Sequence, residues 1–249
     1  MSLTTTTPTY GRLLLRGLLA GLIAGLLAGV FAYATGESRI DAAIAIEQAA
    51  AAQQTGAVDH HGESVGRGVQ RAGLFLATGL YGIAMGGLLA TAYALLRRRL
   101  RTRSDTDAVL ALAGSALLGI VLVPFVKYPA NPPAVGDPNT IDARTISWVA
   151  LVVIGLVAVW AGVVAWRALP PSSPPWLPRA AGTGAFLLVV AVGYAALPSV
   201  DDVPATFPAD LLWDFRLASL GTQVVLWAAL GLAFAALLTR APRRVAVGG

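Results

Sequence analysis

One short segment carries the residue types that bind transition metals. Val58-Asp59-His60-His61-Gly62-Glu63 contains the only two histidines of the chain, with a carboxylate on either side. Imidazole nitrogen and carboxylate oxygen together suit cobalt, nickel, zinc and manganese. The candidate metal ligands are therefore Asp59, His60, His61 and Glu63. The alternative is a pair of solvated histidines in an exposed loop.

A second group of polar residues lies in and beyond a proline-rich segment. Five prolines among the 16 residues 123–138 predict a stiff, irregular turn rather than a helix. Such backbone is tolerated at membrane depth where it lines a watery cavity, so its carbonyls and nearby side chains could coordinate a passing ion. A loop that only closes the outer face, and a glutamine that only joins two helices, are the alternatives. The predicted ion pathway contains Lys127, Tyr128, Asn131, Asp137, Asp214 and Gln223.

The composition indicates a membrane protein. Of 249 residues, 56% are hydrophobic and 12% are charged, about half the charged share of a soluble domain. Without cysteine there is no disulfide, thiolate metal site or cysteine nucleophile. The basic residues separate apolar runs instead of forming one face, which argues against nucleic-acid binding. No Walker, zinc-protease, nucleophile-elbow or dinucleotide-binding motif is present, so the sequence predicts no enzyme and no cofactor.

Six apolar stretches are long enough to cross a bilayer. The sequence predicts an all-α polytopic bundle of six transmembrane helices, arranged as three hairpins in a single membrane domain, residues 1–249. The expected spans are 13–35, 72–96, 108–126, 146–168, 180–197 and 217–239. The outer loop, residues 36–71, is expected to begin with a separate short helix at Ser38, which starts a capping-box pattern.

The loops differ in charge. Twelve of the 18 basic residues fall on the side that holds both termini, which places the N-terminus and the C-terminus in the cytoplasm. Eleven of the 13 carboxylates fall on the other side, where they could gather cations or simply keep the loops soluble. The expected location is the cytoplasmic (inner) membrane, and the first span is expected to be retained rather than cleaved as a signal peptide.

Small and basic residues predict how the helices pack. Glycines at every fourth position of the first span form a stripe for close helix packing, with Gly82 and Gly86 as the expected partners. These stripe residues are Gly17, Gly21, Gly25 and Gly29. An arginine precedes each returning helix, and a carboxylate lies two residues before two of these arginines. The residues expected to form structural ion pairs are Arg71, Arg144, Arg216 and Asp142. A threefold hairpin repeat and three independent loops both explain this pattern.

The motifs KYPANPPAVGDP, from Lys127, and LLWDFRLASLGTQ, from Leu211, resemble those of the CbtA family of proposed cobalt transporter subunits. The resemblance covers nearly the whole chain and implies a permease subunit for Co2+, linked to cobalamin supply. It also implies a small single-span partner of the CbtB type. The positions that match residues marked in the family are Glu37, Asp41, Glu47, Gln70, Arg71, Lys127, Tyr128, Asn131, Asp137, Arg144, Asp214, Arg216 and Gln223. The loop with His60 and His61 is poorer in histidine than in relatives, which favours a capture role there.

The first hypothesis is thus a cobalt permease subunit, with cobalt as transported substrate and the lipid bilayer as its surroundings. The sequence does not separate Co2+ from Ni2+, which are neighbours in the affinity order. A non-transporting accessory or scaffold subunit is the second hypothesis. An integral-membrane enzyme is the third, although no catalytic constellation supports it.

Overall fold

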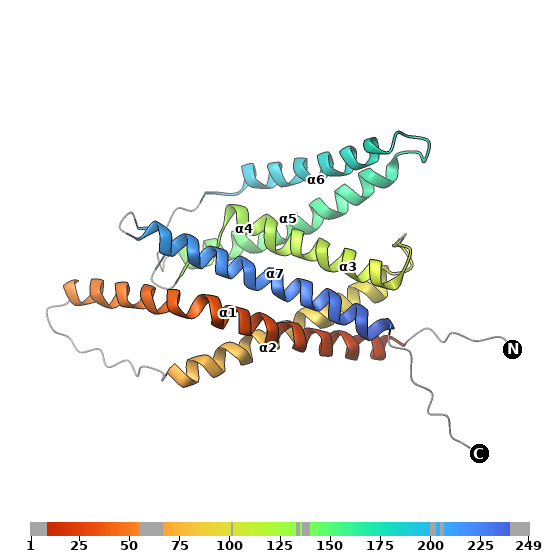
Figure 1. Ribbon diagram of the computed structural model, residues 1–249. Helices are drawn as coiled ribbons and strands as arrows, with labels where there is room; N and C mark the ends of the chain where they lie inside the picture. The colour runs from red at the N-terminus through yellow and green to blue at the C-terminus, as the bar shows by residue number, and fades with distance from the viewer. Residues whose placement is uncertain are drawn as a thin grey trace, which may run out of the picture. The chain divides into compact units, whose positions relative to one another are not determined.

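A computed structural model of the chain describes residues 9–54, 67–100, 102–132, 135, 140–199, 203–204 and 207–239. The described side chains are those of the same ranges without 37–54, 67, 68 and 70. Every regular element in these ranges is helical (Figure 1). The elements are α1 (Tyr10–Gln54), α2 (Arg67–Leu96), α3 (Asp105–Ala116), the π-helix η1 (Leu117–Leu122), α4 (Val123–Lys127), α5 (Ile141–Ala168), α6 (Trp176–Ala196) and α7 (Ala209–Thr239).

Six helical stretches in the described part of the chain are long and apolar enough to span a membrane, as the sequence predicts. They are Tyr10–Gly36, Arg71–Leu96, Asp105–Lys127, Ile141–Ala168, Trp176–Ala196 and Ala209–Thr239. The protein is therefore an all-α, multi-pass membrane protein. The arrangement as three hairpins stays a prediction.

The last span starts eight residues earlier than the sequence predicts, at Ala209 rather than at residue 217. Pro208 stands directly before the helix, and its carbonyl accepts the N–H of Leu212 at 3.1 Å. Proline is tolerated there because the first helical N–H groups have no partner within the helix, and Asp210 suits the positive end of the helix dipole. The charged residues of this segment thus lie on α7 rather than in a loop.

The prediction of a separate helix at Ser38 is wrong. α1 continues without a break from the first span to Gln54. Thr35 Oγ1 donates to the Phe31 carbonyl at 2.8 Å, a bond within the helix, and Gly36 is itself helical. A capping box starts a helix only where the preceding turn is broken, and a single glycine costs a helix only about 1 kcal/mol. The alanine-rich sequence after Ser38 favours continuation.

Backbone contacts divide the chain into two compact units. Unit 1 comprises Met1–Val30, Gly66–Gly114 and Val225–Gly249, and unit 2 comprises Phe31–Val65 and Ser115–Val224. The prediction of a single membrane domain stays a prediction. The core of unit 1 includes Tyr93 and Phe234, both buried, whose rings meet edge to face with centroids 5.8 Å apart.

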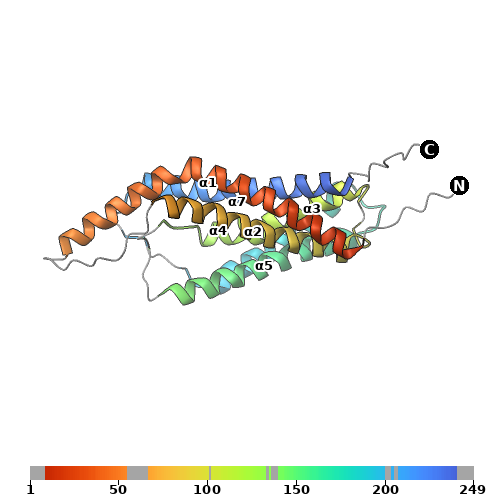
Figure 2. The same ribbon diagram turned by 90° about the horizontal axis from the view of Figure 1, so that it is seen from below.

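Within unit 1, α1 and α2 pack backbone against backbone (Figure 2). A Cβ atom at Gly21 would run into the carbonyl oxygen of Gly82, and a Cβ atom at Gly82 would run into that of Gly21. Gly17 and Gly86 oppose each other in the same way, and Gly25 lies against the carbonyl of Thr78. Only glycine permits such an approach, because any side chain would occupy the space that the other backbone fills.

Unit 2 contains α5 and α6 side by side (Figure 1) and the η1–α4 segment, which packs against α5. Glycine again permits the contact: a Cβ atom at Gly155 of α5 would run into the carbonyl of Gly119 in η1. The N–H of Val123 reaches back to the Leu118 carbonyl, five residues earlier, which is the π-helical pattern.

The π-helix also explains why Pro124 lies inside a helix, where the sequence predicts irregular backbone from residue 123. Pro124 has no N–H, and the N–H of Val123 before it already bonds to the Leu118 carbonyl. The widened π-helical turn therefore meets the proline at a position where the helix expects no hydrogen bond from residue 124. Pro124 is the second residue of α4, within the first turn, where proline is tolerated. The third span therefore extends to Lys127 and brings that side chain to its end.

Candidate functional site

The predicted histidine site lies outside the described residues. Asp59, His60, His61 and Glu63 all fall in the gap 55–66, and Asp137 falls in the gap 136–139. In the ranges that the structure describes, no group of three or more histidine, cysteine or acidic residues is placed to hold a metal ion. The metal-ligand prediction for these residues therefore remains a prediction.

Lys127, at the end of α4, is anchored to the end of α6. Its Nζ atom donates a hydrogen bond to the backbone carbonyl of Tyr194 at 2.9 Å. The same atom lies 5.7 Å from the centroid of the Tyr128 ring and 5.9 Å from that of the Tyr194 ring. Since α6 ends at Ala196, the ammonium also lies near the negative end of the helix dipole. Lys127 is thus stabilised by neutral groups, through a charge-assisted hydrogen bond and two cation–π contacts.

Two tyrosines complete this link between α4 and α6. The hydroxyl of Tyr194 donates to the carbonyl of Val123, so the Lys127 and Tyr194 side chains bond to each other's helix. The hydroxyl of Tyr128 donates to the Pro198 carbonyl, just beyond the end of α6. We call Lys127, Tyr128 and Tyr194 the α4–α6 clasp. Sequence analysis did not select Tyr194, although a tyrosine near the end of an apolar span is a recognisable interfacial signal.

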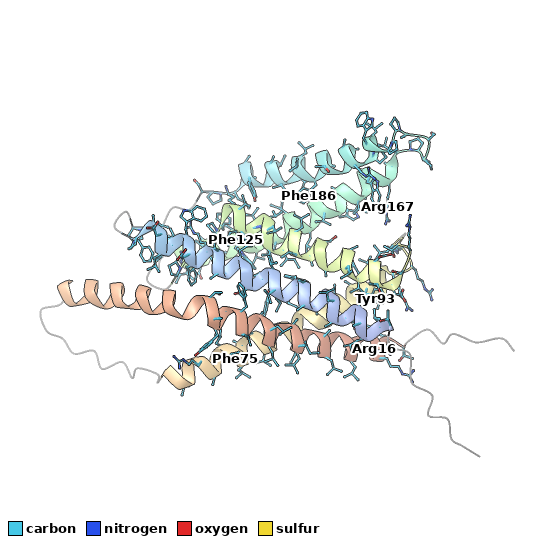
Figure 3. The ribbon with its side chains drawn as sticks, in the orientation of Figure 1. Arg16, Phe75, Tyr93, Phe125, Arg167 and Phe186 are labelled. Carbon is cyan, nitrogen blue, oxygen red and sulfur yellow. The ribbon has the colours of Figure 1, made fainter. Side chains whose placement is uncertain are left out.

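A second cluster joins the segment after α4 to the start of α7. Arg216 Nη2 donates to Asn131 Oδ1 at 3.0 Å. The guanidinium carbon lies 5.8 Å from the centroid of the Trp213 ring, one turn earlier on α7. Arg216 Nε is buried and has no hydrogen-bond partner among the described residues. Figure 3 shows the side chains of α4, where Phe125 is labelled, and of α7.

One acceptor of the predicted ion pathway is left open. Gln223 Oε1 is buried and, within the described ranges, accepts no hydrogen bond. The neighbouring Thr222 hydroxyl is used by its own helix, because it donates to the Ala218 carbonyl at 2.8 Å. Arg216 and Gln223 are seven residues apart, so they lie on nearly the same face of α7 with a rise of about 10.5 Å between them.

The remaining residues predicted for the pathway and for ion pairs lie on helices. Their ion pairs stay predictions. Asp142 and Arg144 lie in the first turns of α5, and Asp214 lies on α7 with an exposed side chain. Arg71 lies on α2 in unit 1. Arg71, Arg144 and Asp214 each take part in at least one interaction.

Comparison with known proteins assigns the family. The CbtA family model, described as a probable cobalt transporter subunit, matches residues 10–239. The chain belongs to the CbtA family. No curated protein and no solved structure matches it.

In this CbtA chain, the match covers all six apolar helices together with the α4–α6 clasp and the Arg216 cluster. The family description indicates a transport role rather than catalysis, with a metal ion as the substrate.

The geometry separates the predicted pathway residues into two kinds. Lys127 and Asn131 are occupied: Lys127 is anchored by a carbonyl, and the amide oxygen of Asn131 accepts from a guanidinium. A positive charge 3.0 Å from that oxygen opposes its use as a cation ligand. Gln223 has a buried oxygen that accepts no hydrogen bond from the described residues.

Proposed function

We propose that this chain is the membrane-embedded permease subunit for uptake of cobalt ions. The observation that carries the proposal is the buried amide oxygen of Gln223, which has no hydrogen-bond partner among the described residues and lies in an apolar span of a member of the CbtA family. Buried polar atoms without a partner are rare and cost about 1–3 kcal/mol each. Such an atom within a transmembrane helix indicates a binding role, because packing alone is better served by an apolar side chain.

An oxygen ligand of this kind suits transport. An ion must bind firmly enough to leave part of its hydration shell and weakly enough to move on, and a neutral amide oxygen meets both needs. The acidic outer loops would concentrate divalent cations, and Asp59, His60, His61 and Glu63 would capture them before they reach the spans. Lys127, Tyr128, Asn131 and Asp214 would shape the entrance rather than coordinate the ion.

The proposed setting follows from charge distribution and family. The excess of arginine on the side of the termini supports insertion in the cytoplasmic membrane with both ends inside. Cobalamin synthesis would be the use of the imported metal, and a small single-span CbtB-type subunit would be the partner. Ni2+ is the expected competing ion because it lies next to cobalt in ligand preference.

The test is radiolabelled cobalt accumulation in cells that lack other cobalt importers, with the chain expressed alone and together with the small partner. Gln223→Leu removes the open oxygen and is expected to abolish accumulation without lowering the amount of protein in the membrane. Thr222→Val is the matched control, since its hydroxyl serves only its own helix. Accumulation that Gln223→Leu leaves unchanged would remove this residue from the pathway.

A second candidate function is an accessory subunit that stabilises another permease. It is favoured by the two fixed cations, Lys127 and Arg216, which repel a bare metal ion in the segment that is expected to admit it. Cobalt uptake by the purified chain alone in liposomes would rule out this candidate. Uptake only with a second permease present would support it.

A further inference from the structure

Among the described residues, the groups in contact with Arg216 do not balance its charge. Its two contacts in the described part of the chain are the amide oxygen of Asn131 and the ring of Trp213, and both groups are neutral. The carboxylates of Asp142, Asp210 and Asp214 are exposed. Buried or half-buried charges in proteins are normally paired, and intramembrane arginines almost always have a partner. Arg216 is half-buried in an apolar helix, so an anionic partner is expected.

The donors around Arg216 indicate what this partner is. Nε is buried and has no partner in the part of the chain that the structure describes, and a guanidinium can only donate hydrogen bonds. Because Asn131 Oδ1 accepts from Arg216, the remaining polar atom of that amide is Nδ2, which also only donates. Lys127, four residues before Asn131, adds a second fixed cation to the same segment. A group of donors with excess positive charge is complementary to an anionic oxygen ligand, and guanidinium matches carboxylate geometry.

The acceptor on α7 completes the pattern. Gln223 Oε1 lies on the same face as Arg216, about 10.5 Å further along the helix. It is an acceptor for which the described ranges contain no donor. A ligand that satisfies both atoms carries negative oxygens at one end and a cation, or water bound to a cation, at the other.

We propose that Arg216 and Asn131 bind the carboxylate of a polycarboxylate ligand that chelates the transported metal. The proposal rests on the proposed function for the identity of the metal, although the carboxylate site stands on its own contacts. It resolves the conflict between a cation pathway and fixed cations, because a carboxylate chelate of a divalent metal is neutral or anionic and is not repelled by Arg216.

The decisive variant is Asn131→Asp. It keeps the shape of the side chain and places a carboxylate oxygen where the amide oxygen now lies, 3.0 Å from the guanidinium. The new carboxylate of this variant would neutralise the charge of Arg216, so the site should no longer bind an external carboxylate. A role of Asn131 as a direct cation ligand predicts the reverse, since an added negative charge would strengthen cobalt binding.

The experiment titrates metal-free citrate into the purified full-length chain by calorimetry, in nanodiscs of neutral phosphatidylcholine. We expect citrate binding by the wild type and a loss of at least about tenfold in affinity for both Arg216→Gln and Asn131→Asp, the effect of one lost charge-assisted hydrogen bond. Arg216→Lys, which keeps the charge but loses the planar fork, should be intermediate. Arg179→Gln, at an exposed arginine of α6, is the control and should bind like the wild type.

Three results would overturn the proposal. One is no citrate binding by a folded wild-type chain, and another is equal binding by the wild type, Arg216→Gln and Asn131→Asp. The third concerns lipid phosphate, which offers similar oxygens: phosphatidylglycerol retained by the wild type and lost in Arg216→Gln, seen by native mass spectrometry without any citrate binding, would assign the site to a lipid.

Cobalt accumulation with and without citrate distinguishes this inference from the proposed function. If Gln223→Leu blocks accumulation of uncomplexed cobalt and citrate does not bind, the carboxylate site is wrong and the permease function stands. If citrate binds at Arg216 but cobalt accumulates in neither form, the site stands and the permease function is wrong.

Discussion

Replacing Gly21 by alanine tests the packing of α1 on α2 most directly. Alanine has the higher helix propensity, which alone would stabilise the chain by about 1 kcal/mol. Its Cβ atom, however, would run into the Gly82 carbonyl and also lie 3.0 Å from Gly86 Cα. These are backbone atoms, so relief requires the two helices to separate.

Overpacking of this kind costs about 1–3 kcal/mol. Set against the propensity gain, Gly21→Ala should therefore change stability by about 0 to 2 kcal/mol in the destabilising direction. Gly184→Ala supplies the matched control, since Gly184 is in the interior of α6 and a Cβ atom there meets nothing within 4 Å. It should be neutral or more stable than the wild type.

The assay is reversible unfolding of the purified chain in detergent by titration with SDS, followed by circular dichroism. The expected result is a difference of about 1–3 kcal/mol between the two variants, with Gly184→Ala the more stable. Equal midpoints for Gly21→Ala and Gly184→Ala would refute the backbone contact between α1 and α2, because propensity is common to both.

Three other expectations follow from unit 2 and are measured in the same unfolding assay. Tyr194→Phe removes the hydrogen bond to the Val123 carbonyl but keeps the ring near Lys127, so it should lower stability by about 1 kcal/mol; Tyr10→Phe, whose exposed side chain bonds the Thr91 hydroxyl where water can replace it, should lower it less. Lys127→Met removes the bond to the Tyr194 carbonyl and should lower stability, whereas Lys127→Arg should retain most of it; equal loss in both would contradict a simple anchoring role. Gly155→Ala should destabilise the chain because its Cβ atom would run into the Gly119 carbonyl of η1, and stability equal to that of Gly184→Ala would count against this contact.

The sequence predicts the six spans because about twenty consecutive apolar residues rarely form anything other than a transmembrane helix. It is less informative where helices begin and end. The rule that charges mark loops misplaces the start of α7, since Asp210 and Asp214 lie on the helix. The capping pattern at Ser38 is wrong as a helix start because α1 is already formed there. Local signals describe what a segment can do in isolation, and a continuous helix overrides them.

The prolines also show that local sequence signals mispredict helix boundaries. Proline content predicts irregular backbone from residue 123, yet α4 includes Pro124 because η1 shifts the hydrogen-bond register before it. No pattern in the residues 117–122 signals a π-helix, nor that Gly119 within it meets Gly155, which lies 36 residues later. The displaced register matters for the site, since it carries the helix as far as Lys127.

The candidate site residues Lys127, Asn131, Arg216 and Gln223 could be named from the sequence, but their partners could not. A polar residue near the end of an apolar span has three possible roles, as ligand, anchor or interhelical contact, and only geometry separates them. The position of Tyr194 near the end of an apolar span marks it as interfacial, but its partner is a backbone carbonyl, an acceptor that every residue carries and no sequence pattern marks.

The membrane environment determines which of these polar contacts stability alone can explain. In hydrocarbon, a donor must find an acceptor within the protein, and the carbonyls at helix ends are the ones that the helix itself leaves unused. Lys127 uses such a carbonyl in the last turn of α6, and Tyr128 uses the Pro198 carbonyl just beyond that helix, so stability alone accounts for both side chains. Arg216 Nε and Gln223 Oε1 are buried on one face of α7 without any partner in the described ranges, so stability does not account for them. A donor and an acceptor left open together on one helix face are best explained by a ligand that fills both.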